Sequence, residues 1–408
     1  MSDIDAPEVF VWQNIEEQAR ALFALYGFNE IRTPILERTQ VFTRSIGDDT
    51  DIVQKEMYTF EDRGGRSLTM RPEGTAGVVR YLAGKGQDAG DARLFYIGPM
   101  FRSERPQAGR KRQFHQCGVE MVSPPSPLVD AECIALQLHL LKEWGLDGCV
   151  LKINTRGEAH ESRQIADELC ARLMPNREDL CADCQRRIDE NILRVLDCKN
   201  PECGAIVDAM PPLTEFMSAD SRAYFDKVVA LLNELGLRPK ITPRLVRGLD
   251  YYNNTVWEIA HPALGAQDAL AGGGRYSIQM GKKPLEGVGF AMGLERVIMA
   301  LNAVDALVET LSESVLLWFV SMGAKALDAN FILEQELRNR GVACGMDMTG
   351  RSMKAQMRAA NRANARFVVI CGDDEVAKRV LLLKDMGSGE QCEIDKETLI
   401  ERILQEKG

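Results

Sequence analysis

The chain has 408 residues, of which 45% are hydrophobic and 27% are charged, so it has the composition of a globular protein and the length for two or three domains. Its net charge of −10 gives no sign of a general affinity for nucleic acid, although such a total can conceal a local basic face. The longest strongly apolar run, residues 315–320, is too short to span a bilayer, the N-terminus shows no secretory signal, and an odd total of 11 cysteines does not fit a disulfide framework. We therefore expect a cytoplasmic protein with no membrane partner.

The N-terminal part of the chain mixes strands and helices without regular alternation. Apolar spacing and turn residues predict a helix over residues 11–26, an interrupted strand over 28–37, strands at 94–97 and 117–121, and a helix over 128–144. From about residue 158 to 237 the sequence changes to charged helices with clustered cysteines, as an insertion would. Strand character returns at Ile241 and includes Val246 and Leu249, and a helix follows near 293–303.

The remaining residues, from about 314 to 408, alternate between strand and helix. Strands are predicted at 315–320, 343–348 and 366–371, and helices at 327–340, 351–364 and 395–406. This alternation indicates a small α/β domain.

A short polar motif, Arg71–Thr75, follows a predicted strand. Glu73 and Thr75 stand on a turn shaped by proline and glycine, where a carboxylate and a hydroxyl could bind an ammonium group or a polar ring. A plain turn explains the same residues equally well, so this motif alone decides nothing.

A second motif, residues 95–122, carries charged side chains on two predicted strands joined by a loop. Side chains at even spacing share a strand face, so Met100, Arg102 and Glu104 are expected on one face. On the second strand the shared face carries Phe114, Gln116, Gly118 and Glu120. An arginine there can bind a phosphate through two N–H groups while carboxylates bind amines, which disfavours a merely solvated hairpin.

Two further stretches place polar residues and glycines inside predicted strands. Residues 247–252 combine a cation, a glycine, an anion and two tyrosines. Residues 271–276 contain three consecutive glycines, which permit close approach of a ligand to the backbone, followed by Arg275 and Tyr276. The glycines at 287–293 do not form a dinucleotide fingerprint, because no βαβ unit with a distal acid accompanies them.

Together these stretches resemble a known family. Residues 95–122 and Gly293–Arg296 resemble motifs 2 and 3 of the class II aminoacyl-tRNA synthetases, and residues 27–37 resemble their dimer-forming motif 1. Residues 245–259 and 271–276 are similar to two peptides peculiar to histidyl-tRNA synthetase. The resemblance covers nearly the whole chain.

The resemblance implies an α+β fold, with a class II catalytic domain on an antiparallel sheet over residues 1–310 and a helical insertion at about 158–237. An α/β anticodon-binding domain is implied over residues 314–408. The implied function is that of a homodimeric histidine–tRNA ligase, which activates histidine with ATP and transfers it to tRNA(His). Mg²⁺ would accompany ATP on the pyrophosphate, and no organic cofactor is implied.

The resemblance also implies which residues meet the substrates. Arg247 and Arg102 would act catalytically, on opposite sides of the α-phosphate of ATP. The residues implied for ATP are Arg102, Glu104, Arg110, Phe114 and Arg296. The residues implied for histidine are Glu73, Thr75, Arg102, Gln116, Glu120, Arg247, Tyr251, Tyr252 and Tyr276.

Contacts with tRNA are expected at Gln107 and along a basic stripe in the C-terminal domain. The stripe follows helical spacing over residues 351–366 with no acid between its members, which are Arg351, Lys354, Arg358, Arg362 and Arg366. Such a stripe suits phosphate contacts, but a solvated helix face explains the same pattern, and both interpretations stay open.

Four cysteines in the insertion form two pairs. They are Cys181, Cys184, Cys198 and Cys203. Paired thiols are typical of a structural zinc site. The second pair is wider than a zinc knuckle and the family does not depend on zinc there, so we favour reduced structural thiols and expect no firm metal site.

Two other functions fit part of the sequence. A synthetase-like regulatory subunit of ATP phosphoribosyltransferase would bind histidine without activating it, but such proteins typically lose the motif arginines, whereas Arg102, Arg247 and Arg296 are present here. A synthetase for another amino acid is disfavoured by residues 247–252. The chain departs from the family pattern in lacking a strand ahead of its first helix, in carrying Ser277 where the family has aspartate, and in a shorter segment after it.

Overall fold

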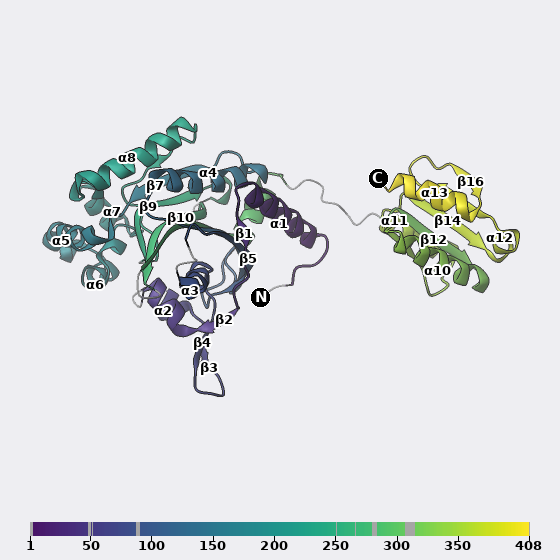
Figure 1. The fold of residues 1–408 in the computed structure, drawn as a ribbon, viewed down its shortest axis with the longest axis horizontal. Helices are drawn as coiled ribbons and strands as arrows, with labels where there is room; N and C mark the ends of the chain where they lie inside the picture. The colour runs from purple at the N-terminus through teal and green to yellow at the C-terminus, as the bar shows by residue number, and fades with distance from the viewer. Residues whose placement is uncertain are drawn as a thin grey trace. The chain divides into compact units, whose positions relative to one another are not determined.

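A computed structural model describes residues 3–47, 50, 52–86, 90–249, 251–265, 267–279, 284–306 and 315–407. The chain forms two compact units, one built mainly from residues 11–308 and the other mainly from residues 309–408 (Figure 1). Over the described ranges, no helix combines the length and the apolar character that crossing a bilayer requires.

The first unit is organised by an eight-stranded sheet in the order β1-β5-β6-β11-β10-β9-β7-β8. Its strands are β1 (Asn29–Glu30), β5 (Arg93–Phe101), β6 (Gln113–Val122), β7 (Val150–Thr155), β8 (Lys240–Ile241), β9 (Tyr252–Ala260), β10 (Ala269–Gln279) and β11 (Pro284–Gly293). Neighbours run antiparallel except at the two edges, where β1 is parallel to β5 and β8 is parallel to β7. The predicted α+β fold on an antiparallel sheet is therefore confirmed.

Alternation along the strands gives this sheet two different faces. On β6, Cys117, Val119 and Met121 are buried in the main hydrophobic core. Because successive side chains in a strand point to opposite faces, Gln116 and Glu120 lie on the other face. The even spacing predicted that Gln116 and Glu120 share a face. That face is the polar face of the sheet, and the opposite face packs against the core.

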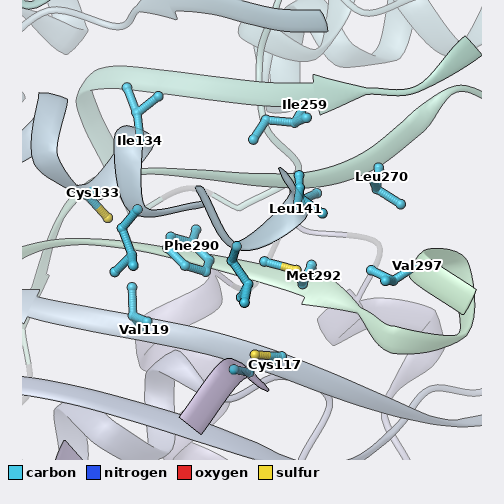
Figure 2. Close-up of a cluster of buried hydrophobic side chains, with 14 of the residues drawn as sticks. Cys117, Val119, Cys133, Ile134, Leu141, Ile259, Leu270, Phe290, Met292 and Val297 are labelled. Atoms are coloured by element: carbon cyan, nitrogen blue, oxygen red, sulfur yellow. The ribbon is translucent and has the colours of Figure 1, made fainter. Parts of the chain in front are cut away.

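Four helices cover the packing face. They are α1 (Glu8–Leu25), α4 (Pro127–Glu143), α8 (Ala219–Glu234) and α9 (Leu294–Ala303). Figure 2 shows Ile134 and Leu141 of α4 packed toward Phe290 and Met292 of β11, with Val119 of β6 beneath them. Each side chain of this size stabilises the fold by about 1.5–3 kcal/mol when it is fully buried, so this layer fixes the sheet on which the polar face is built.

The polar face is partly covered by α2 (Thr39–Ile46), α3 (Thr75–Lys85) and a small sheet in the order β2-β4-β3. The strands of this sheet are β2 (Leu36–Arg38), β3 (Thr59–Glu61) and β4 (Ser67–Met70). Helix α3 is held there by Val78 and Leu82, which pack against Tyr96 and Met100 of β5. The N-terminus of α3 is therefore positioned over the centre of the large sheet.

The insertion contains α5 (Ser162–Leu173), α6 (Ala182–Glu190) and α7 (Pro201–Asp208), which lie together beside β9 (Figure 1). These helices and the short turns between them share a hydrophobic core of their own. Val246, in the segment between the insertion and β9, also belongs to this core. Helix α8 packs instead against α4, with Phe225, Val228 and Leu232 in the main core. Val246 and Leu249, predicted as strand, lie in an irregular connection before β9.

The second unit has a five-stranded sheet in the order β13-β12-β14-β15-β16. Its elements are β12 (Leu317–Met322), α10 (Ala324–Asn339), β13 (Cys344–Met346), α11 (Met353–Arg362), β14 (Phe367–Gly372), α12 (Asp373–Lys378), β15 (Leu381–Asp385), β16 (Gln391–Ile394) and α13 (Lys396–Glu406). Strands β13, β12 and β14 are parallel, as the alternation predicted, whereas β15 and β16 form an antiparallel hairpin that the sequence analysis did not identify.

Candidate active site

The polar face of the large sheet contains a cavity of about 510 Å³. Every residue that the resemblance assigns to histidine or ATP lines it: Glu73, Thr75, Arg102, Glu104, Arg110, Phe114, Gln116, Glu120, Arg247, Tyr251, Tyr252, Tyr276 and Arg296. They come from the start of α3, from β5 and β6 with the loop between them, from the segment around β9, from β10 and from α9. Four separate sequence motifs thus meet in one cavity.

The carboxylate of Glu73 is held at the start of α3. The backbone N–H groups of Thr75 and Ala76 donate to its two oxygens, each at 2.7 Å. Burial raises the pKa of this carboxyl, while these two donors and the helix dipole act in the opposite direction. The turn predicted at Arg71–Thr75 therefore exists, and it fixes a buried acid at the cavity wall.

Glu120 lies beside this turn, on β6. The hydroxyl of Thr75 donates to its Oε1 at 2.7 Å, whereas its Oε2 is buried with no hydrogen-bond partner among the described residues. Burial raises the pKa of Glu120 to about 8. Oε1 of Gln116, on the same face of β6, is also buried without a partner in this part of the chain. Because buried polar atoms are normally paired, these oxygens are suited to a polar ligand.

Three tyrosines close the same part of the cavity. The ring centroids of Tyr251 and Tyr252 are 4.7 Å apart, and those of Tyr251 and Tyr276 are 5.9 Å apart, both in edge-to-face geometry. Burial raises the pKa of the Tyr276 hydroxyl well above its ordinary value. These rings therefore stay neutral and form a rigid wall beside the buried acids.

Glycines on β10 and β11 make room for the polar side chains. A Cβ at Gly289 would lie 2.3 Å from Oε2 of Glu120, and a Cβ at Gly272 would lie 2.6 Å from the guanidinium carbon of Arg247. The run of three glycines predicts close approach of a ligand to the backbone. At Gly272 the structure shows that the space admits a side chain of the protein itself.

The phosphate-binding candidates are arginines at different depths of the cavity. Nε of Arg102 donates to the carbonyl of Pro72 at 2.9 Å, and its guanidinium lies 5.2 Å from the ring centroid of Phe114. Nη1 of Arg247 lies 3.4 Å from Glu258. Nε of Arg247 is buried with no hydrogen-bond partner in the described ranges, so this guanidinium retains a donor for a ligand.

Arg296 lies in the first turn of α9, as predicted. It donates to the carbonyls of Ala269, at 2.8 Å, and of Gln267. Burial, followed by the neighbouring charge of Arg110, lowers the pKa of Arg296. A second cation close enough to disfavour the charge of Arg296 makes this part of the cavity suited to a polyphosphate, which relieves that repulsion.

Strand β5 ends earlier than the sequence spacing predicted. It stops at Phe101, so Arg102 and Glu104 do not continue the strand face of Met100. They lie in the loop to β6, where Oε2 of Glu104 is 3.7 Å from Nη1 of Arg110. The prediction of one shared strand face was wrong for these two residues, although both still line the cavity.

Some residues of the cavity were not predicted. Glu56, Arg194, Asp197 and Glu258 line it as well. A signal existed for Glu258, because its neighbours Trp257 and Ile259 are core residues and strand alternation puts the residue between them on the opposite face. Glu56 and Arg194 lie in short helices and Asp197 follows one, and such segments are too short for sequence periodicity to indicate a direction.

The predicted contacts with tRNA lie outside this cavity. The side chain of Gln107 accepts a hydrogen bond from Gln267 at 3.0 Å and is exposed. Helix α11 spans Met353–Arg362, so the predicted stripe over residues 351–366 is not a single helical face. Arg351 precedes the helix and pairs with Asp347, and Arg366 follows the helix and pairs with Glu406 at 2.7 Å.

The basic side chains that do lie on α11 are exposed. They are Lys354, Arg358 and Arg362, spaced four residues apart along one face. Asp250, the anion of residues 247–252, lies outside the described residues.

The four insertion cysteines come together in the fold. The sulfurs of Cys181, Cys184, Cys198 and Cys203 all lie within 4.8 Å of one another. No disulfide is formed by the described cysteines.

Comparisons with known proteins agree along the full length. A family model described as histidyl-tRNA synthetase matches residues 1–297, and one described as an anticodon binding domain matches residues 314–406. The histidine–tRNA ligase of Halothermothrix orenii is 46% identical, over 98% of this chain and 97% of that protein. The ligase of a Geobacillus species is 44% identical, over 98% and 96% respectively.

Solved structures give the same result. The apo histidyl-tRNA synthetase of S. aureus is 34% identical and superposes with a TM-score of 0.83, over 99% of this chain and 98% of that one. A protein of Bacillus halodurans, titled as an ATP phosphoribosyltransferase regulatory subunit/histidyl-tRNA synthetase, is 21% identical with a TM-score of 0.65, over 91% of this chain and 97% of that one. The second likeness supports the fold alone.

Proposed function

The chain belongs to the histidyl-tRNA synthetase family and is an ATP-dependent histidine–tRNA ligase, and we propose that the cavity described above is its active site. The observation that carries this proposal is the convergence of four sequence motifs on one cavity that retains buried polar atoms without partners.

Histidine occupies the part of the cavity between α3, β6 and the three tyrosines. The free Oε2 of Glu120 accepts a ring N–H of the imidazole, while Gln116 and Glu73 receive the ammonium group. An amino acid without an imidazole would leave these buried atoms unpaired, and a site built on such hydrogen bonds rejects analogues by about 10⁴-fold or more in the best cases.

ATP occupies the part of the cavity lined by arginines. Phe114 offers an aromatic face to adenine, and Arg110 and Arg296 bind the outer phosphates. Magnesium, which accompanies ATP as part of the substrate, prefers oxygen ligands, and the carboxylates along the cavity wall meet that preference.

Activation of histidine is an in-line displacement. A carboxylate oxygen of histidine forms a bond to the α-phosphorus of ATP as the bond to pyrophosphate breaks, which gives histidyl-adenylate. Arg102 and Arg247 stabilise the charge that develops on the α-phosphate, and both are held in advance by contacts with the protein. A hydroxyl of the terminal ribose of tRNA(His) then attacks the carbonyl carbon and releases AMP.

We assign catalysis to residues 1–310 and anticodon binding to residues 314–408. A homodimer is supported by exposed apolar side chains on and beside the segment that resembles motif 1, where Ile35 is 42% and Leu36 is 46% exposed. Light scattering that gives the mass of one chain at micromolar concentration would contradict the dimer. The thiols of the described cysteines are free, which fits the reducing cytoplasm where we place this enzyme.

The test of the proposed site is histidine-dependent exchange of pyrophosphate into ATP, combined with binding of histidine alone. Exchange that requires histidine and the presence of Arg247 supports the assignment. Binding of histidine without any exchange would favour a regulatory protein, and exchange with another amino acid would refute the proposed pocket.

A further inference from the structure

The four cysteines of the insertion form a compact group of sulfurs that the ligase reaction does not use. Their Sγ atoms lie within 4.8 Å of one another, and those of Cys181 and Cys198 are 3.8 Å apart. Sulfurs bound tetrahedrally at about 2.3 Å from one zinc ion are about 3.8 Å apart, whereas the sulfurs of a disulfide are separated by about 2.05 Å. The 3.8 Å separation of Cys181 and Cys198 matches shared coordination of an ion, and the other sulfurs lie within 4.8 Å of this pair.

Local structure directs all four sulfurs to the same point. Cys181 is the residue before α6 and Cys184 lies in its first turn, while Cys203 lies in the first turn of α7. Cys198 follows a short helix, η5 (Ile192–Val195), that connects these two helices. The backbone N–H of Cys181 donates to Sγ of Cys203 at 3.2 Å, and donors of this kind accompany sulfurs that carry charge.

We propose that Cys181, Cys184, Cys198 and Cys203 bind one structural Zn²⁺ ion. The ligand set is closed, because four thiolates complete a tetrahedron and leave no position for substrate, so the ion stabilises the fold and takes no part in catalysis. Each thiol loses its proton on binding, and the complex carries a net charge of −2 from four thiolates and one Zn²⁺. The wider spacing of the second pair, which disfavoured a zinc site in the sequence, is accommodated because Cys198 lies in the connection after η5 whereas Cys203 lies on α7.

The cluster is tied to the peptide that leads into the active site. Nη2 of Arg244 donates to the carbonyl of Cys198 at 3.0 Å, and its Nε donates to the carbonyl of Leu196 at 3.2 Å. Arg244 stands three residues before Arg247, and its positive charge lies next to the anionic centre that the ion would form. Asp197, the neighbour of a proposed ligand, lines the cavity. A metal ion would therefore fasten the insertion segment that forms part of the cavity wall.

Metal content decides the proposal directly. The full chain, purified without a metal-affinity step and analysed by mass spectrometry of its elements, is expected to contain about one zinc per chain. Cys184→Ser removes one proposed ligand and should lose the zinc. Its matched control is Cys170→Ser, which should retain the zinc because Cys170 lies on α5 in the same insertion but outside the cluster. Zinc below about one tenth per chain in the natural protein, or full zinc in Cys184→Ser, would overturn the proposal.

A second measurement covers the case in which Cys184→Ser fails to fold. The natural chain, produced in medium supplied with cobalt in place of zinc, should show the intense charge-transfer absorption of tetrahedral thiolate-bound Co²⁺. Its absence from a folded, cobalt-grown protein would overturn the site, and bound iron in the protein from ordinary medium would overturn the assignment to zinc. None of these readouts depends on ligase activity, so a failure here is distinct from a failure of the proposed active site.

Discussion

The proposed active-site cavity and the basic face of α11 both present cations, but in opposite physical settings. In the cavity, Arg102 and Arg247 are held by contacts with the protein on a packed sheet, beside buried acids. On α11, Lys354 and Arg358 project from an exposed helix face. Charges that are fixed inside a site can stabilise charge on a particular atom of a substrate. Exposed charges attract a ligand more weakly, because water and salt screen them. Equal charges in these two settings should therefore differ greatly in the size and the salt dependence of their effects.

The largest effect is expected from Arg247→Ala. Loss of a preorganised donor to the reacting phosphate costs about 10²–10³-fold in rate. Histidine-dependent pyrophosphate exchange should fall by that factor, while histidine still binds, as isothermal titration would measure. Arg163→Ala, at an exposed position outside the cavity, serves as the control. Near-normal exchange in Arg247→Ala would remove Arg247 from the mechanism.

Glu120→Gln should mainly weaken binding of histidine. The substitution keeps the shape of the side chain but replaces an acceptor oxygen with an N–H donor, and a buried group left without its partner costs about 1–3 kcal/mol. The KM for histidine should therefore rise by roughly 5- to 150-fold, with the KM for ATP little changed. A larger change for ATP than for histidine would place Glu120 in the wrong subsite.

The same variant tests the buried acid through the pH dependence of stability. In the folded protein the pKa of Glu120 is about 8, whereas in the unfolded chain it is near its ordinary value of about 4.3. Between these values the folded state binds more protons, so the free energy of unfolding should fall as pH rises from about 5 to about 8. Chemical denaturation without histidine should show a shallower fall in Glu120→Gln. An identical pH dependence in the two proteins would contradict a neutral, buried Glu120.

A smaller effect is expected on the exposed face of α11. The double variant Lys354→Ala with Arg358→Ala should weaken binding of tRNA(His) by roughly tenfold, because two phosphate contacts are lost, and should flatten the dependence of affinity on salt. Pyrophosphate exchange, which needs no tRNA, should stay unchanged. Lys325→Ala, on α10 in the same unit, is the control for a general loss of positive charge. Unaltered tRNA binding in the double variant would show that α11 is only a solvated face.

The smallest effect is expected from Arg351→Ala. Arg351 already pairs with Asp347, so part of its charge is neutralised within the protein. The affinity for tRNA(His), measured by filter binding, should fall by less than in Arg358→Ala alone. An equal or larger loss in Arg351→Ala would mean that the ion pair opens when RNA binds.

Much of the fold could be predicted because the relevant signals are local. The helix predicted over residues 11–26 is α1 (Glu8–Leu25), and the helix predicted over 128–144 is α4 (Pro127–Glu143), since apolar spacing over several turns records which face is buried. The hairpin β15–β16 was missed because its strands are short and neither shows a regular alternation of buried and exposed residues. The end of β5 was missed because a strand stops where its partner stops, which spacing within one strand does not record.

The sequence by itself determined the family, the residue types of the cavity and the strand faces of Gln116 and Glu120, because motifs and period-two alternation are properties of short segments. Only the tertiary structure decided which segments meet. Glu258 lies beside Arg247, and the side chain of Arg247 in turn packs over Gly272. The sulfurs of the four cysteines between positions 181 and 203 lie within 4.8 Å of one another. These contacts join residues that are distant in the chain, and their distances are set by how helices and strands pack against a shared core.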